Sequence, residues 1–514
     1  MTVPSMVRAQ VSKTFRSYWQ GESLRSRFVR STVWSVVGTA AAQGSTFGAA
    51  IITARILGKS TYGEFGMVQS TVGTFGILAG LGLGLTSTKF IAEFRKTDLD
   101  RVGRIIGLNF LVAIASGLAG AGFLWSLAPY LASHNLNAPY LAHVLRISCL
   151  LLVFNAWAGV QQGVLAGFEA FRAIAKINTV RGIAMFPSSI VMALLWGLDG
   201  ALWALTANGA LGCVLAISEL RKQNREHSIR IDWSSCWQEA SILWRFSLPA
   251  VVTSSLVGPI TWVANTIIVN RPNGYAEMGA LTAANQFRLC LVALPTLIQS
   301  AVLPILSSEQ REAQLTPDYH RAIDLTQVTS MIAVLPIGTV LILLGQQVMT
   351  FFGASFSGSY PVLLGLLVGS LLSMVGGAVG AAITARGQMW LGAMFNAVWG
   401  GVLLVTTWFL APNFGATAYA IAFALAHVVL AVGGLSILRR ELSKRVITRV
   451  FATIGYLAIL SVICISFGNV GRVTMLICMS LLTACALPHW RRFLPFPPLN
   501  VQAAEIDQLA VEQR

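Results

Sequence analysis

Charged residues are scarce in this chain of 514 residues, because Asp, Glu, Lys and Arg together make up only 11% of it. Ordinary soluble domains carry about 25%. Hydrophobic residues make up 55% of the chain, and its mean hydropathy is +0.69. A soluble enzyme of this size would need far more polar surface, so the composition favours a polytopic membrane protein. The seven cysteines form no CxxC pair and no cluster with histidine, which argues against disulfides and against a metal site.

Long hydrophobic runs are abundant. A helix that crosses a bilayer needs about 20 mainly apolar residues. The sequence predicts fourteen such spans, at residues 32–57, 65–88, 105–127, 147–168, 177–196, 201–217, 246–269, 278–306, 328–352, 362–384, 390–410, 416–438, 452–467 and 473–487. The connections between them are short, so we expect no catalytic domain on either side of the membrane.

The net charge of +16 is distributed in a pattern that indicates topology. Thirty of the 36 basic residues lie in the N-terminal segment, in alternate loops or in the tail; the fourth loop, for example, is predicted to hold Arg172, Lys176 and Arg181. By the positive-inside rule, both termini are predicted to be cytoplasmic. The excess of positive charge is therefore a topology signal and does not indicate nucleic-acid binding.

The spans fall into two equal sets, which predicts an all-α protein with two six-helix lobes at residues 32–220 and 246–438, as in transporters with internal repeats. A cytoplasmic inter-lobe loop at 221–245 is predicted to separate them. Residues 439–451 are predicted to form another cytoplasmic loop, 452–487 two additional transmembrane helices, and 488–514 a cytoplasmic tail. Residues 1–31 are predicted to be a cytoplasmic basic segment, either an interfacial amphipathic helix or a disordered arm.

One stretch carries a family resemblance. Residues 54–66 read ARILGKSTYGEFG, followed by GLGLG at 80–84 and IAE at 91–93. Weaker agreement comes from QQG at 161–163, FSLP at 246–249, and LP and LPIL at 294–295 and 303–306. Over roughly residues 32–440 the chain resembles the Wzx-type polysaccharide flippases of the multidrug/oligosaccharidyl-lipid/polysaccharide exporter superfamily.

This resemblance implies two lobes around a central cavity that opens alternately to either side of a bacterial inner membrane. The implied substrate is a lipid-linked oligosaccharide, on an undecaprenyl diphosphate carrier, that moves from the cytoplasmic to the outer leaflet for exopolysaccharide, capsule or O-antigen synthesis. The implied partners are membrane lipids and the glycan polymerase and glycosyltransferases of the same pathway. No cofactor is expected, and the sequence does not choose between Na⁺ and H⁺ as a coupling ion.

Arg288 is the leading candidate for a substrate contact. It lies ten residues, or about 15 Å of helix, after Met278 at the start of its predicted span. An arginine at that depth is costly and indicates function, and its forked guanidinium suits phosphate. In the alternative, the span begins near Leu289 and leaves Arg288 at the interface.

Other candidates carry weaker arguments. Arg55 would bind phosphate at the outer mouth of the cavity or, in the alternative, reach lipid headgroups. Several amides inside spans would bind sugar hydroxyls or, in the alternative, join helices to one another: Gln43, Asn155, Gln161, Asn265 and Asn285, with Asn109, Gln286 and Asn396 as further members. Trp262, Trp390 and Trp399 would stack on sugars or simply lie in lipid-facing positions.

Acidic residues are missing from the middle of every predicted span. Cation-coupled drug antiporters use such a carboxylate to bind the ion, so its absence weakens a multidrug antiporter as the alternative function. A glycan polymerase or ligase would need a large outer loop, which the sequence lacks. A scramblase or a purely structural membrane protein remains open at this point.

Overall fold

The computed structural model describes residues 24–247, 256–309, 317–385, 389–437 and 444–466, and these residues form helices and no strand. The main helices are α2 (Leu24–Gly80), α3 (Leu83–Phe94), α4 (Leu99–Tyr130), α5 (Leu141–Gly167), α6 (Phe171–Glu226), α8 (Val257–Val269), α9 (Gly274–Glu309), α10 (Pro317–Leu343), α11 (Gly345–Met349), α12 (Tyr360–Ala385), α13 (Met389–Phe414), α14 (Ala416–Ile437) and α15 (Lys444–Ser466).

Where their residues are described, the first thirteen predicted spans fall on helices, apart from one or two residues at breaks and ends; the second crosses from α2 to α3 and the ninth from α10 to α11. Residues 248–255 of the seventh span and the whole of 473–487 lie outside the described residues. Helix α2 holds the first predicted span and most of the second, with a break at Gly58, and α6 holds the fifth and sixth, with a break at Gly197. Gly58 has a φ of 77°, which glycine adopts at little cost. Eight described helices are long and apolar enough to cross a membrane, or nine if the bent pair Ser330–Leu343 and Gly345–Phe352 counts as one span. The all-helical membrane fold is confirmed, while the number fourteen and the orientation stay predictions.

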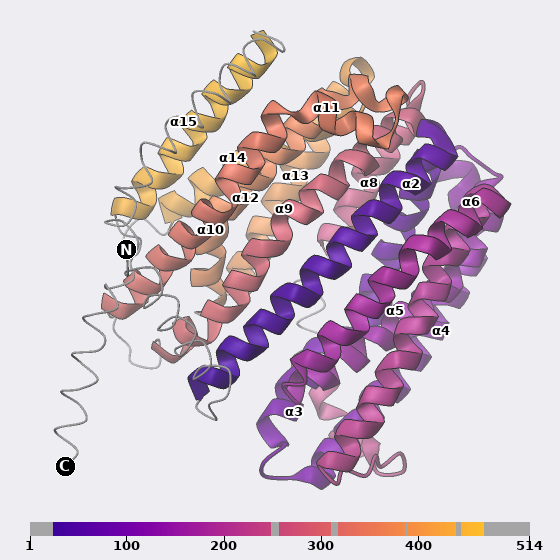
Figure 1. Cartoon of the computed structure of the whole chain (residues 1–514), viewed down its shortest axis with the longest axis vertical. Coiled ribbons are helices and arrows are strands. Elements are labelled where there is room, and N and C mark those ends of the chain that lie inside the picture. The colour runs from indigo at the N-terminus through magenta and orange to yellow at the C-terminus, as the bar shows by residue number, and fades with distance from the viewer. Residues whose placement is uncertain (1–23, 248–255, 310–316, 386–388, 438–443, 467–514) are drawn as a thin grey trace, which may run out of the picture.

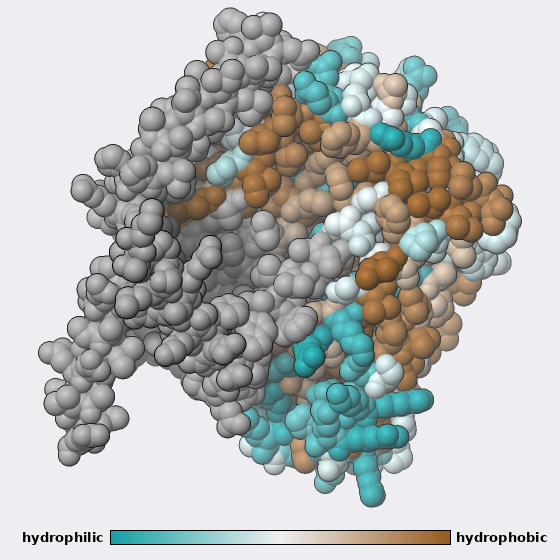
Figure 2. All heavy atoms as spheres, viewed as in Figure 1, coloured by the Kyte–Doolittle hydropathy of each residue, from teal (hydrophilic) through white to brown (hydrophobic). Residues whose placement is uncertain are grey.

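The helices form two groups that lie side by side (Figure 1). We call α2–α6 the N-terminal lobe and α8–α14 the C-terminal lobe; α15 packs against the second group through α10, α12 and α14. One end of the N-terminal lobe carries Arg95, Arg101 and Arg104, and Figure 2 shows hydrophilic side chains gathered there. We call it the basic end, which the charge pattern predicts to be cytoplasmic, and we call the opposite end, near Gly58 and Gly197, the far end.

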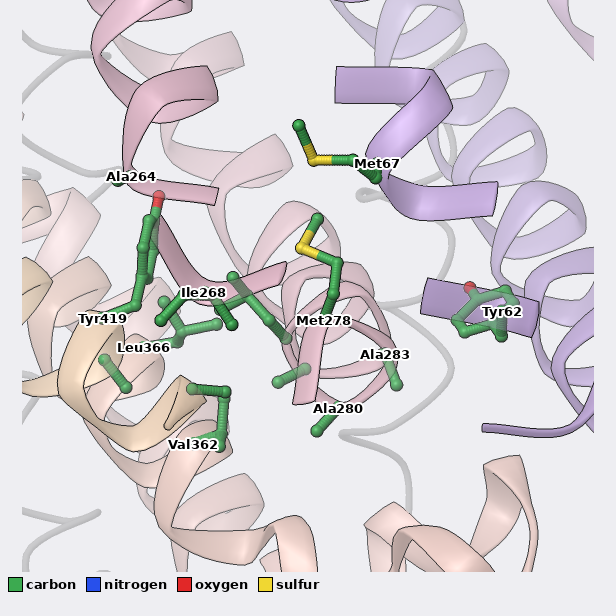
Figure 3. Close-up of a cluster of buried hydrophobic side chains, with 14 of the residues drawn as sticks. Tyr62, Met67, Ala264, Ile268, Met278, Ala280, Ala283, Val362, Leu366 and Tyr419 are labelled. Carbon is green, nitrogen blue, oxygen red and sulfur yellow. The ribbon is translucent and has the colours of Figure 1, made fainter. Parts of the chain in front are cut away.

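The buried side chains form two separate cores. The larger core contains Tyr62 and Met67 of α2 together with Ile268 of α8, Met278 of α9 and Leu366 of α12, so it joins the two lobes (Figure 3). The smaller core, which includes Leu83, Val102, Val160 and Leu220, belongs to the N-terminal lobe alone and lies toward the basic end. Among the residues whose side chains are described, the lobes therefore share a core only away from the basic end.

The chain between the lobes is described up to Ser247, and part of it lies on α4. Backbone carbonyls of Arg230 and Asp232 approach Gly103 and Gly107 so closely that a side chain on either glycine would collide with them. Glu239, which is 7% exposed, accepts hydrogen bonds from Arg101 at 3.1 Å and Arg104 at 3.4 Å. The predicted cytoplasmic loop at 221–245 is thus held against the N-terminal lobe by ion pairs to the buried Glu239.

Candidate functional site

Arg288 lies fourteen residues, or about 21 Å of helix, after the start of α9 at Gly274. The helix therefore begins well before Leu289, while the point along it at which the membrane span begins stays a prediction. Phe287 and Leu291 beside it are buried, and the Arg288 side chain is half-buried. Its Nε donates a hydrogen bond to Oδ1 of Asn285, 2.6 Å away, so the structure brings together two of the predicted site residues.

Aromatic side chains of α14 lie next to Arg288. Its guanidinium carbon is 5.5 Å from the centre of the Phe423 ring, a cation–π contact. Tyr419 and His427, one helical turn to either side of Phe423, are close enough to interact electrostatically with Arg288. The His427 ring lies 4.4 Å from that of Phe423 and 6.0 Å from that of Trp399. Phe423 thus gives the cation a polarisable neighbour, and none of these rings supplies a negative charge.

No carboxylate balances Arg288 among the side chains that the structure describes, and Asn285 accepts its only hydrogen bond there. A guanidinium can donate five N–H groups, so most of them stay available to a ligand. An arginine whose neighbours are a neutral amide and aromatic rings can bind an anion, because a planar fork of donors fits a phosphate or a carboxylate.

Three of the candidate amides join helices to one another. Gln161 donates from Nε2 to the carbonyl of Cys213 at 3.0 Å, Asn109 donates to Ser87 at 2.9 Å, and Asn265 donates to Ser70 at 2.9 Å. For these residues the alternative, interhelical hydrogen bonding, is the one observed. Asn155 is exposed on α5, and Gln43 is half-buried on α2. These two remain candidates for contact with a sugar.

The tryptophans behave differently from one another. Trp262 donates from Nε1 to Oγ1 of Thr71 at 3.0 Å, so it bridges the lobes. Trp399 is buried beside His427, whereas Trp390 is 83% exposed. Only Trp390 therefore has the broad exposure that stacking on a free ligand or lying in lipid requires.

Arg55 lies at the far end and is exposed there. Its Nε donates to the backbone carbonyl of Phe351, which follows α11, at 2.7 Å. This hydrogen bond joins the lobes, a role that the sequence did not predict. The predicted phosphate contact at this residue stays a prediction, with its remaining guanidinium donors as the groups that would make it.

Helices α2 and α8 join the lobes through a row of three hydrogen bonds, which we call the polar zipper. Its members are Thr74 with the carbonyl of Gly258 at 3.2 Å, Thr71 with Trp262 at 3.0 Å and Ser70 with Asn265 at 2.9 Å. Further toward the far end, a side chain on Gly66 would collide with Thr282, and one on Gly279 would collide with the carbonyl of Lys59. Gly66 belongs to the stretch at 54–66 that carries the family resemblance, and close approach of the lobes is a physical reason for glycine there.

Sequence reasoning missed Arg181, which it assigned to a loop. Arg181 lies ten residues after the start of α6 and is half-buried. Its Nε donates to Oδ1 of Asn208 at 3.2 Å, and Nδ2 of Asn208 donates back to the carbonyl of Arg181 at 2.7 Å. Its position inside the predicted span at 177–196 could have identified it as a residue of the membrane helix. The positive-inside pattern instead grouped it with the basic residues of the preceding loop.

Known proteins share both the sequence pattern and the fold. The EPS I polysaccharide export inner membrane protein EpsE of Ralstonia nicotianae is 22% identical over 414 residues, which cover 78% of this chain and 91% of the relative. The structure of the lipid II flippase MurJ in an inward closed conformation has a TM-score of 0.68 at 13% identity and covers 90% of this chain and 100% of its own. An inward-facing MATE multidrug transporter has a TM-score of 0.65 at 15% identity, with coverage of 82% and 99%.

These comparisons agree with the helices described above. The chain has the fold of the MATE transporter and of the MurJ flippase. Its apolar helices and its inner-membrane relative identify it as a multi-pass inner membrane protein, as the sequence predicted. The model of the polysaccharide biosynthesis protein family matches residues 28–310, more than half of the chain. The chain therefore belongs to the polysaccharide biosynthesis protein family.

Proposed function

We propose that this protein is a polysaccharide flippase. Its substrate is an oligosaccharide linked to a lipid carrier, undecaprenyl diphosphate, and it carries this substrate from the cytoplasmic to the outer leaflet by alternating access. The product serves exopolysaccharide, capsule or O-antigen synthesis, and the polymerase and glycosyltransferases of that pathway are its expected partners. The name of the Ralstonia relative, a polysaccharide export protein, supports this proposal.

The observation that carries the proposal is Arg288. Its guanidinium lies deep in α9, has no carboxylate partner among the described side chains, and keeps most of its donors available. A diphosphate is the part of the proposed substrate that most needs such a partner, because moving its charge into a low-dielectric cavity is costly without a cation. The sugar hydroxyls would meet amides such as Asn155 and Gln43.

The distribution of acids disfavours the multidrug antiporter. The acidic side chains that the structure describes lie near helix ends or helix breaks; Glu277, for example, lies in the first turn of α9, where it accepts a hydrogen bond from the backbone of Ala416 at 2.9 Å. A coupling site for a cation, and a cavity for cationic drugs, would need a carboxylate inside a span.

A deletion strain complemented with Arg288→Ala and Arg288→Lys tests the proposal. We expect the deletion to accumulate lipid-linked oligosaccharide, and Arg288→Ala to reduce polysaccharide export at least tenfold while the protein still reaches the membrane. Lysine should restore part of the export, because it keeps the charge but not the fork. Exposed Arg225 at the end of α6 provides the control, and Arg225→Ala should export normally. Normal export by Arg288→Ala, or a deletion strain without lipid-linked glycan, would overturn the proposal.

A further inference from the structure

The N-terminal lobe contains a small pocket between α5 and α6, at the basic end, lined by apolar residues such as Leu165 and Ile177 as well as by polar ones. Gln161 and Gln162 of α5 line it together with Asn178, Arg181 and Gly212 of α6. The open space is about 10 Å³, which is room for about one water molecule or one oxygen atom of a larger group. We propose that this pocket binds an oxyanion group of the substrate, a phosphate or a carboxylate, through Arg181. The inference deepens the proposed function and rests on it for the identity of the ligand.

Arg181 is built into the pocket by its neighbours. Asn208 fixes it through two hydrogen bonds, one from the guanidinium and one to the backbone. A methyl group on Gly212 would lie 2.7 Å from both Cδ and Nε of Arg181, so only glycine leaves room for this side chain to lie across the helix. The guanidinium is therefore held in one place before any ligand arrives.

The charge of Arg181 has no counter-charge nearby. It makes no ion pair with the side chains that the structure describes, and Asn208 accepts its only hydrogen bond there. One and a half turns closer to the helix start, Lys176 is exposed and pairs with Glu219 at 2.7 Å. Of these two cations, Arg181 is the deeper and less solvated one, and it is the one without an anionic partner. A charge in that position is costly and indicates a functional partner.

Gln161 gives the pocket a second, independent feature. Its side chain is 0% exposed, and while Nε2 donates to Cys213, its Oε1 has no hydrogen-bond partner. A buried acceptor without a donor costs about 1–3 kcal/mol. A chloride ion would satisfy Arg181 but not this oxygen. A group that offers an anionic oxygen to Arg181 and a hydroxyl to Gln161, as a sugar acid or a protonated phosphate does, satisfies both.

A polar strip leads to the pocket along α5. Asn155, Gly159 and Gln162 follow helical spacing and are all exposed, although α5 packs against α2, α3, α4 and α6. Amide side chains of a spanning helix that face lipid would be left without hydrogen bonds, so this strip faces a water-filled space. The pocket would thus be reached from the same polar surface that carries the sugar candidate Asn155.

Binding of inorganic phosphate to the purified full-length protein tests the inference. The experiment uses the Arg288→Ala background, so that any phosphate bound at Arg288 is removed, and follows the midpoint of thermal unfolding as phosphate is added. We expect phosphate to raise the midpoint and Arg181→Gln to weaken its apparent affinity at least tenfold. Asn178→Ala, which leaves the contacts of Arg181 with Asn208 intact, should weaken it several-fold and covers the case in which Arg181→Gln does not fold. The control Arg225→Gln should keep the affinity.

Three outcomes would overturn the site. The first is no shift of the unfolding midpoint with phosphate, and the second is an equal shift with chloride. The third is a phosphate affinity that neither Arg181→Gln nor Asn178→Ala changes from that of the Arg288→Ala parent. Two further measurements test whether the ligand of the pocket is part of the substrate or free phosphate. One repeats the titration with glucuronate in place of phosphate, and the other measures export by Arg181→Gln in cells. If free phosphate alone were the ligand, Arg181→Gln would lose binding and still export normally, which would contradict the substrate assignment. The binding measurement does not depend on transport. A failure of the Arg181 site can therefore be told apart from a failure of the proposed function, which the export test of Arg288 measures.

Discussion

Amide side chains inside membrane helices serve two different purposes in this protein, and the surroundings of each residue decide which. Asn265 is buried and donates to Ser70 across the lobes, so its amide stabilises packing. Asn155 is exposed in the polar strip of α5, although α5 itself packs against several other helices. From sequence alone the two residues look alike, because each is a single asparagine in an apolar run.

Alanine at each of these positions should separate the two purposes. Asn265→Ala removes an interhelical hydrogen bond, which is worth about 0.6 kcal/mol on average in membranes, and should lower the Tm of the purified protein. Asn155→Ala should leave the Tm unchanged and reduce export, because it removes a group that meets the sugar. Thermal unfolding in detergent and export in a complemented deletion strain measure both effects. An equal loss of Tm in the two variants would show that Asn155 is a packing residue as well.

Much of the residue-level chemistry could be predicted, and the failures have physical reasons. Arg288 stood out because charge inside a 20-residue apolar run is costly wherever its side chain points. Arg181 was missed because it lies within three turns of Arg172 and Lys176, where a loop and a helix start carry the same charges. The inter-lobe role of Arg55 depends on Phe351, which is 296 positions away in the chain, and no local pattern reports such a contact.

At the scale of elements, the segment between the lobes is a docked part of the N-terminal lobe. Its backbone lies on glycines of α4, and Glu239 is buried between Arg101 and Arg104. Asp232 starts the turn before it, where hydrogen bonds from Ser235 and Ser234 lower the pKa of its carboxyl to about 2.

Glu239→Gln should destabilise the protein, because it leaves two arginines without their shared counter-charge. We expect a loss of about 1–3 kcal/mol, the cost of leaving buried polar groups unsatisfied, seen as a fall in Tm of several degrees. Glu226→Gln is the matched control, since Glu226 is exposed and its pair with Lys222 spans 3.8 Å. Such surface pairs contribute little, so its Tm should not change. The same Tm for both variants would contradict the docking role of Glu239.

At the scale of the whole molecule, the contacts between the lobes that the described side chains make gather toward one end. The shared core, the polar zipper and the close glycine contacts all lie toward the far end, while the second core belongs to the N-terminal lobe alone. Arg55 with Phe351, and Asn270 with the carbonyl of Asn135 at 2.6 Å, add hydrogen bonds at that end. A cavity between these lobes would therefore be closed at the far end in this conformation.

The proposed alternating access requires the polar zipper to separate in every transport cycle. Cysteines in place of Ser70 and Asn265, in a chain without its native cysteines, place two thiols where a hydrogen bond of 2.9 Å now joins the lobes. A short, reducible thiol cross-linker should then abolish export, and a reductant should restore it, because the linked lobes cannot part. The control pair replaces Ser87 and Asn109, which form the same type of bond at the same distance within one lobe, so cross-linking there should leave export intact. Undiminished export through a fully cross-linked Ser70–Asn265 pair would mean that substrate crosses without separation of the lobes at the zipper.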